Sequence, residues 1–422
     1  MKKGWQTKPL ADLCEVFADG DWIESKDQSP EGIRLIQTGN VGEGVFKDRG
    51  EKARYISEAT FKRLRCTEIL EGDCLISRLP DPAGRSCLLP DTGERMITAV
   101  DCTIVRFNRK QAFPEFFNYY SQSCDYLSAV DGETTGTTRK RISRSKLAQT
   151  LIPVPPLPEQ QRIVGILDEA FEGIATAKAN AEKNLQNARA FFESHLESVF
   201  TQRSKGWVEK SFSELCDIKH GYAFEGEFFS NEGEYVLLTP GNFYERGGYR
   251  DRGEKQKYYT GEIPRDYVLN EGDLLVAMTE QAAGLLGSPI LAPESNKFLH
   301  NQRLGLVTKK PGVAWTNEFF FHVFNTRPVR KVIHASASGV KVRHTSPTKI
   351  GEVVVAFPTS LPEQKRIVTT LASLTEETQR LARLYERKLA ALEALKKSLL
   401  HQAFSGQLTM DNGQRAMRKS VS

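Results

Sequence analysis

A cluster of basic and hydroxylated side chains lies between residues 134 and 144, where the chain reads Thr-Thr-Gly-Thr-Thr-Arg-Lys-Arg-Ile-Ser-Arg. Lys and Arg neutralise phosphate groups, and Ser and Thr hydroxyls bond to phosphates or base edges. Such a segment predicts contact with a nucleic acid. The candidate contacts here are Thr137, Thr138, Arg139, Lys140 and Arg141.

A second segment of this kind occupies residues 336–346, reading Ser-Ala-Ser-Gly-Val-Lys-Val-Arg-His-Thr-Ser. Its candidates are Lys341, Arg343 and His344. A charged loop standing alone is more often a solvated surface, but its recurrence at the equivalent place of a repeat favours DNA contact. Polar turns supply weaker candidates, since turn chemistry uses the same residue types. These are Gln37, Thr38, Asn40, Arg78 and Arg85 in the first half, and Thr239, Asn242, Tyr244, Thr279 and Gln281 in the second.

The chain repeats itself once, with a period of about half its length. The best match joins Leu157–Val164 to Leu361–Val368, which differ at one position in eight. Long stretches between the matching segments differ widely, so a scaffold is duplicated while much of its surface is not. Two further matches pair Lys3-Gly4-Trp5 with Lys205-Gly206-Trp207 and Asp48-Arg49-Gly50-Glu51-Lys52 with Asp251-Arg252-Gly253-Glu254-Lys255.

The elements that position these side chains are of two kinds. The first ~150 residues of each half contain short β-rich runs punctuated by Gly, Asp and Pro, which predicts a strand-rich mixed α/β domain. One helix is expected at 113–126 and its counterpart at 317–333. Extended proline-containing connectors at 153–156 and 357–358 then lead into proline-free stretches of over 40 residues.

Those two stretches are predicted to be long helices that pair as an antiparallel coiled coil. Each would extend about 63 Å if 42 residues rise ~1.5 Å apiece. The expected seams place polar Asn184 and Lys388 at equivalent positions, where a buried polar residue would fix the register, and leave Phe192 and Leu384 on the outer faces. The seam positions are Ile163, Leu167, Ala170, Ile174, Ala177, Ala181, Asn184, Ala188 and Phe191, facing Ile367, Leu371, Leu374, Thr378, Leu381, Tyr385, Lys388, Leu392, Leu395 and Leu399.

The predicted fold class is therefore α+β, with two similar mixed α/β domains separated by two long antiparallel coiled-coil helices and related by an internal pseudo-two-fold repeat. Divergent surfaces on one scaffold would read different half-sites on double-stranded DNA, giving a bipartite, asymmetric target. The expected boundaries are 1–156 and 205–360 for the domains, 157–204 and 361–408 for the helices, and 409–422 for a flexible tail.

Composition restricts the class of protein further. The 422 residues carry a net charge of +5, which permits nucleic-acid binding without demonstrating it. No apolar run reaches the ~18 residues of a membrane span, and the basic start lacks a signal peptide's apolar core, so a cytoplasmic protein is expected. Seven cysteines without a CxxC pair argue against a disulfide framework or a metal site.

These features together resemble the Type I restriction-modification specificity subunit, the HsdS family. The resemblance extends to about Leu408 and rests first on the twin Leu-Pro-Glu-Gln helix openings and the Gly-Trp domain starts. The helix end Gln402–Leu408 and the stretch Gly136–Lys140 add to it. The second half departs from the family pattern at Gly339–Arg343.

The resemblance implies two target-recognition domains and two conserved spacer helices, with no catalysis in this chain. It implies partners of three kinds: double-stranded DNA, two methyltransferase (M) subunits and two restriction (R) subunits. S-adenosylmethionine would bind the M subunits, and ATP with Mg²⁺ the R subunits, so no cofactor is expected in this chain.

Two other classes of protein remain open at this point. An autonomous enzyme is disfavoured because the chain has no phosphate-loop motif, no HExxH motif and no methyltransferase signature. A coiled-coil structural adaptor without sequence-specific DNA binding would need only the helices. Salt-dependent and sequence-dependent DNA affinity separates the adaptor from a specificity subunit.

Overall fold

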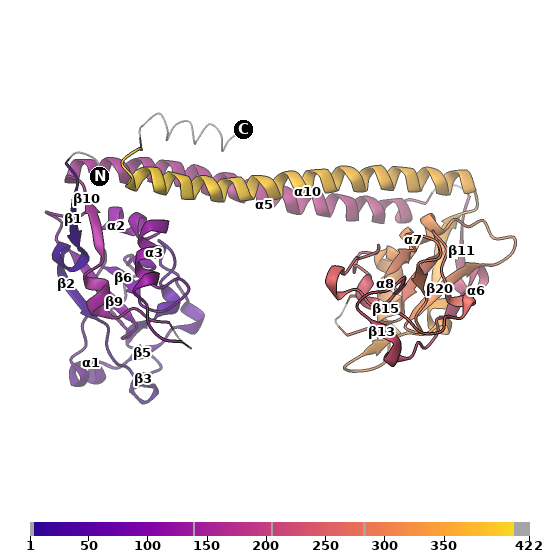
Figure 1. Ribbon diagram of the computed structural model, residues 1–422, viewed down its shortest axis with the longest axis horizontal. Coiled ribbons are helices and arrows are strands. Elements are labelled where there is room, and N and C mark those ends of the chain that lie inside the picture. Colours follow the sequence, from indigo (N-terminus) through magenta and orange to yellow (C-terminus); the bar gives the residue numbers. More distant parts are fainter. Residues whose placement is uncertain (1–3, 138–139, 204–205, 282–283, 409–422) are drawn as a thin grey trace. The chain divides into compact units, whose positions relative to one another are not determined.

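The computed structural model describes residues 4–137, 140–203, 206–281 and 284–408 (Figure 1). The chain divides into two compact units, one made of Met1–Lys183 with Tyr385–Ser422 and the other of Asn184–Leu384. Each unit contains one mixed α/β domain and one half of each long helix. Within the described ranges, no helix combines the length and the apolar composition that a bilayer span requires.

The first domain is built on two four-stranded sheets. One is antiparallel, in the order β2-β9-β6-β7, and the other runs β3-β5-β4-β8 with a parallel pairing of β4 and β8. The strands are β2 (Cys14–Asp19), β3 (Gln28–Ser29), β4 (Ile33–Ile36), β5 (Tyr55–Ile56), β6 (Cys74–Ser77), β7 (Ser86–Leu88), β8 (Met96–Thr98) and β9 (Cys102–Phe107). The helices are α1 (Glu58–Leu64), α2 (Pro114–Tyr120), α3 (Cys124–Gly132) and α4 (Arg144–Ala148).

The second domain repeats both four-stranded sheets in the same order and adds a two-stranded pairing of β17 with β21. Its sheets run β12-β20-β16-β18 and β13-β15-β14-β19, again with one parallel pairing, between β14 and β19. The predicted fold class and internal repeat are thereby confirmed. The strands are β12 (Cys216–His220), β13 (Phe229–Ser230), β14 (Tyr235–Leu237), β15 (Tyr258–Tyr259), β16 (Leu274–Ala277), β17 (Thr279–Glu280), β18 (Pro289–Leu291), β19 (Phe298–Leu299), β20 (Leu304–Lys309) and β21 (Arg343–His344). The helices are α6 (Phe212–Leu215), α7 (Asn317–Asn325), α8 (Arg327–Ala335) and α9 (Pro347–Gly351).

Each domain begins and ends in one two-stranded antiparallel ribbon. In the first, β1 (Gln6–Pro9) pairs with β10 (Leu151–Val154); in the second, β11 (Trp207–Ser211) pairs with β22 (Val354–Pro358). Residues 153–154 and 357–358 of the expected extended connectors are therefore the ends of strands β10 and β22. Their prolines are tolerated because a two-stranded ribbon leaves an outer edge that needs no donor.

The single helix expected in each domain at 113–126 and 317–333 is wrong, because two short helices stand in its place. In the first domain Ser123 accepts a hydrogen bond from the Tyr126 amide and starts α3. In the second, Pro328 lies in the first turn of α8, where its missing N–H does no harm. The apolar periodicity continued through both breaks and concealed them.

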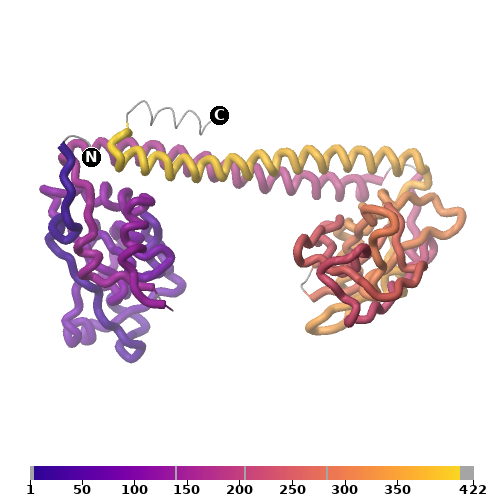
Figure 2. Tube along the Cα trace, viewed as in Figure 1, coloured from indigo at the N-terminus to yellow at the C-terminus, as the bar shows by residue number. Residues whose placement is uncertain are grey.

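The long helices are α5 (Leu157–Thr201) and α10 (Leu361–Phe404), traced side by side in Figure 2. In the first unit the amino-terminal half of α5 packs against the carboxyl-terminal half of α10, so the two halves are antiparallel there. Ile163 and Leu167 share one core with Leu399 and with Phe404, whose ring lies 5.3 Å from that of Phe116 on α2. The helices are thus continuous with the domain core.

In the second unit the expected seam is wrong at Asn184 and again beyond Ala188. Phe191 is 61% exposed, and Asn184 is exposed rather than buried, so it does not fix the register. Phe192 and Leu196 take the inward positions and pack against the second domain's core, so Phe192 is not on an outer face. A straight helix drifts against a seven-residue repeat, and a step from 188 to 192 to 196 absorbs that drift.

One buried glutamine joins each helix to its domain. Gln160 is 1% exposed; its Oε1 accepts the Phe113 amide at 2.8 Å, and its Nε2 donates to the carbonyls of Gln111 at 3.1 Å and Pro155 at 2.8 Å. Gln364 repeats the arrangement in the second unit, with its side chain fully buried. Its partners are the Thr316 amide at 3.0 Å and the carbonyls of Ala314 at 2.9 Å and Pro358 at 3.0 Å. This bonding explains why the Leu-Pro-Glu-Gln segment is the best-matched part of the repeat.

We expect Gln160→Leu to destabilise the first unit by about 3 kcal/mol, because it leaves buried backbone groups without partners at ~1–3 kcal/mol each. Gln161→Leu is the matched control, since Gln161 is exposed and its loss should change stability by less than ~0.5 kcal/mol. Thermal denaturation of the two variants measures the difference. Equal melting temperatures would contradict the role given to Gln160.

Candidate nucleic-acid interface

A short 3-10 turn follows the first strand of the parallel pair in each domain, namely η3 (Thr38–Asn40) after β4 and η6 (Pro240–Asn242) after β14. In the first turn the Asn40 Oδ1 accepts the Gln37 amide at 3.0 Å, and its Nδ2 donates to the Lys47 carbonyl at 2.9 Å. The turn therefore holds the loop 41–47 in place. Asn40 is 7% exposed, so its side chain shapes the turn and is not presented to a ligand.

The second domain builds the same turn with different neighbours. Asn242 is fully buried; its Oδ1 accepts the Thr239 amide at 3.0 Å, and its Nδ2 donates to the Gln256 Oε1 at 2.9 Å. The predicted contact Asn242 is thus internal, like Asn40. Thr239 keeps one side at the surface, where it lines a pocket.

Two arginines predicted to contact DNA in the first domain are instead tied to its loops. Arg78 is 4% exposed and lies 3.1 Å from an Asp19 carboxylate oxygen, with a further bond to the Val100 carbonyl. The Arg85 guanidinium donates to four backbone carbonyls, and burial lowers the pKa of both arginines. They position loops rather than reach for a ligand. The Arg85 acceptors are Val41 at 2.8 Å, Leu79 at 2.8 Å, Pro82 at 2.9 Å and Thr38 at 3.0 Å.

The basic segment of the first domain forms a loop closed by a bridge between Thr135 and Arg141. Thr137 and Lys140 are exposed on it, and Lys140 lies 3.5 Å from an Asp131 carboxylate oxygen. Arg141 lies 3.3 Å from Asp101. These surface ion pairs are weak enough to exchange for a phosphate. The other two candidates of this segment, Thr138 and Arg139, lie outside the described residues.

The equivalent loop of the second domain is closed by a bridge between Ser338 and His344. Lys341 and His344 are exposed on it, whereas Arg343 is engaged with Glu280 at 3.1 Å. Glu280 lies between the predicted contacts Thr279 and Gln281. The structure makes its carboxylate the organiser of this region, with a side chain 1% exposed.

Glu280 fixes two segments at once. Its Oε1 accepts from Arg343 on the neighbouring strand β21, and its Oε2 accepts three consecutive backbone amides of the following loop. Such a set of donors offsets the cost of burying a carboxylate. The three amides are those of Gly284 at 3.0 Å, Leu285 at 2.8 Å and Leu286 at 3.1 Å.

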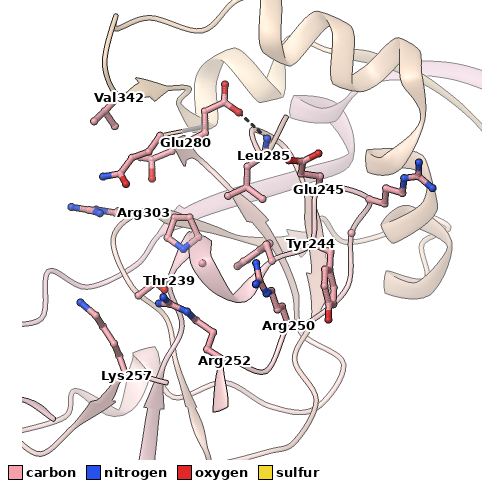
Figure 3. A pocket seen from close by; sticks show the side chains of 17 residues that line it. Thr239, Tyr244, Glu245, Arg250, Arg252, Lys257, Glu280, Leu285, Arg303 and Val342 are labelled. Atoms are coloured by element: carbon pink, nitrogen blue, oxygen red, sulfur yellow. Dashed lines mark hydrogen bonds between the residues drawn. The ribbon is translucent and has the colours of Figure 1, made fainter. Parts of the chain in front are cut away.

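A pocket of about 940 Å³ opens beside this region in the second domain (Figure 3). It brings together four of the predicted contacts: Thr239, Tyr244, Thr279 and Gln281. Tyr244 is 53% exposed, and the Arg250 guanidinium lies 6.0 Å from the centre of its ring. The cationic lining, which residue-type reasoning missed, consists of Arg246, Arg250, Arg252, Lys257 and Arg303.

The charge of this pocket favours an anion. Five cations line it against the carboxylates of Glu245 and Glu280, and Glu280 is already occupied by Arg343 and backbone amides. An aromatic ring among cations at a surface is a combination that binds nucleic acids, through phosphate contacts and stacking. The signal for it was in the sequence, since Arg252 belongs to the repeated Asp-Arg-Gly-Glu-Lys segment.

A smaller pocket of about 130 Å³ occupies the matching place in the first domain. Arg34 is occupied there, because it pairs with Asp48 and lies 2.7 Å from Glu94. Its lining also includes Gln37, Asn40, Arg49, Lys52 and Arg54.

Two copies of one mixed α/β domain, each with a cationic pocket beside the same turn and each joined by a glutamine to a long helix, define a duplicated nucleic-acid-binding scaffold. Comparison with known families agrees with this class. The model of the Type I restriction modification DNA specificity domain matches residues 2–186 and again 204–387. The chain therefore belongs to that family.

Two curated relatives illustrate the similarity. The Type I restriction enzyme EcoBI specificity subunit of Escherichia coli is 24% identical over 69% of this chain and 65% of its own length. The MjaVIII specificity subunit of Methanocaldococcus jannaschii is 20% identical over 74% of each chain. The match to the Escherichia coli protein thus spans just under two thirds of that relative.

Solved structures share the fold. A chain from a structure of complex assembly and conformational transition of the type I R-M system has a TM-score of 0.77 at 18% identity, over 97% of this chain and 99% of that one. The HsdS subunit from Thermoanaerobacter tengcongensis has a TM-score of 0.59 at 18% identity, over 97% and 98%.

Proposed function

We propose that this chain is the DNA sequence-specificity subunit of a Type I restriction-modification complex in host defence. It reads a bipartite, asymmetric double-stranded target through its two domains, and its helices hold the methyltransferase and restriction subunits. The observation that carries this proposal is the cationic pocket at the same place in two domains whose surface residues differ.

In this proposal the chain is non-catalytic, and chemistry resides in its partners. Two M subunits bring S-adenosylmethionine, and two R subunits bring ATP and Mg²⁺. Exposed apolar side chains on the long helices, Phe191 at 61% and Leu384 at 43%, favour a role for the helices in assembly, because a partner helix would cover them.

The proposed DNA contacts are those predicted side chains that the structure leaves at the surface. Asn40, Asn242, Arg78, Arg85 and Arg343 are assigned to positioning, because their polar atoms bond within the chain. The proposed contacts are Gln37, Thr38, Thr137, Lys140 and Arg141 in the first domain, and Thr239, Tyr244, Thr279, Gln281, Lys341 and His344 in the second.

The test is to delete the gene and map methylated bases across the genome by long-read sequencing. Loss of one bipartite methylated motif, restored by the wild-type gene, is the expected result. An adaptor without sequence readout would also abolish methylation when deleted, so a second arm is needed. Substituting Thr279 and Gln281 by alanine should alter one half of the motif, whereas under the adaptor alternative the motif stays as it was.

A further inference from the structure

Arg49 and Arg252 occupy equivalent positions in a short segment that is identical in the two domains, although the surrounding loops differ. The segments at 48–52 and 251–255 both read Asp-Arg-Gly-Glu-Lys. Both fold into a 3-10 turn, η4 (Gly50–Lys52) and η7 (Gly253–Lys255), with the arginine directly before it. Identity of sequence is therefore accompanied by the same type of turn.

Both arginines lie against the glycine of the neighbouring turn. A Cβ added to Gly39 would lie 2.1 Å from the Arg49 Nη1, and one added to Gly241 would lie 3.0 Å from the Arg252 Nη1. The two turns are themselves fixed by the buried side chains of Asn40 and Asn242. Each guanidinium therefore occupies space that is open only because the neighbouring residue, Gly39 or Gly241, has no side chain.

Neither guanidinium has a hydrogen bond or an ion pair among the residues that the structure describes. The aspartates that precede them are used elsewhere: Asp48 pairs with Arg34, and the Asp251 Oδ1 accepts the Gly253 amide at 2.9 Å. An arginine held without a carboxylate contributes no ion-pair stability to the fold. Its five donors remain available to an external anion.

We infer that Arg49 and Arg252 are equivalent phosphate contacts, one in each recognition domain, that bind the DNA backbone whatever the base sequence. The inference rests on the proposed function. Two domains that read different half-sites share only the sugar-phosphate backbone of their ligand, so a group retained on both surfaces fits that shared part. Guanidinium matches a phosphate bidentately, and backbone contacts set affinity and register rather than specificity.

The experiment measures DNA binding by the complex of the full chain with its methyltransferase subunits, on a duplex carrying the mapped target and on one without it. Arg49→Ala and Arg252→Ala should each weaken binding about tenfold. The same factor should apply to both duplexes. The slope of log affinity against log salt should become shallower by about 0.9 for each arginine removed. The methylated motif in the genome should stay unchanged.

Matched variants distinguish the loss of a phosphate contact from a change in the net charge of the chain and from a loss of folding. Arg109→Ala removes the same charge from an exposed position of the first domain and should leave affinity and salt slope as in the wild type. Arg49→Lys keeps the charge and should keep the slope while losing part of the affinity. Gly39→Ala adds a methyl group where the guanidinium lies, and Gly241→Ala does so in the second domain. Both should weaken binding severalfold, with unchanged melting temperature, by displacing the arginine.

Three results would overturn the inference. An unchanged salt slope in both alanine variants would remove the phosphate contact, and an equal effect of Arg109→Ala would reduce it to net charge. Loss of binding confined to the target duplex, with an altered methylated motif, would make the arginines base readers. Failure of the wild-type complex to prefer its target would instead refute the proposed function.

Discussion

Inserting four residues into each long helix, between Lys183 and Asn184 in α5 and between Leu384 and Tyr385 in α10, is expected to lengthen the unread gap of the DNA target by one or two base pairs. These points divide the two compact units. Four helical residues add ~6 Å and turn the chain by ~400°, so each domain keeps nearly its original facing. At ~3.4 Å per base pair, 6 Å is slightly under two base pairs. Long-read mapping of methylated bases measures the gap.

Two residues inserted at the same points are the control. They turn the helix by ~200°, so the domain faces away from the duplex and methylation should be lost rather than re-spaced. An insertion after Phe200 would not serve, because Leu196, Val199 and Phe200 already pack on the second domain's core. An active four-residue variant with an unchanged gap would show that the helices do not set the spacing.

Replacing residues 1–156 by the corresponding domain of another family member is expected to exchange one half of the target and preserve the other. Binding to the original target should fall at least ~100-fold, since each mismatched base pair costs ~1–3 kcal/mol. The graft should fold, because Gln160 bonds only to backbone atoms of the domain. A donor with different side chains still offers the same amide and carbonyls.

The reciprocal exchange of residues 205–360 should change the other half-site alone. Gln364 bonds to backbone groups at Thr316, Ala314 and Pro358, and only its 3.3 Å contact from the Thr316 hydroxyl depends on a side chain of the domain, so the second junction is nearly as tolerant. Methylated-base mapping of both chimaeras decides the matter. A change in both half-sites from a single exchange would mean that the two readouts are coupled.

The sequence predicted the duplicated fold well because its signals were local and repeated. Proline placement and apolar periodicity marked the two long helices, and the Leu-Pro-Glu-Gln repeat marked their starts. The same periodicity predicted one continuous helix where the N-cap residue Ser123 in fact starts a second one. It also placed Phe191 on the seam, because a seven-residue repeat extrapolated over many turns accumulates the helix's drift.

The site was harder to predict, because a residue type does not reveal whether its polar atoms are already used. Asn40 and Asn242 are predicted DNA contacts by residue type, yet both are buried in the turns that they build. Arg85 is a predicted DNA contact by residue type, yet its guanidinium already donates hydrogen bonds to four backbone carbonyls. Residue type alone does not single out Arg252, although Arg252 lies in a segment that the repeat preserves. Recurrence on a divergent surface was the better guide than residue type.

The glutamine joint has a mechanical consequence for each unit. Rotating a helix by a single residue swings its side chains through ~100°, which would pull the Gln160 amide away from all three of its partners. The joint therefore resists torsion. Any over- or underwinding of the helix pair is transmitted to the attached domain as a rotation of its reading face, instead of being dissipated in a swivelling linker.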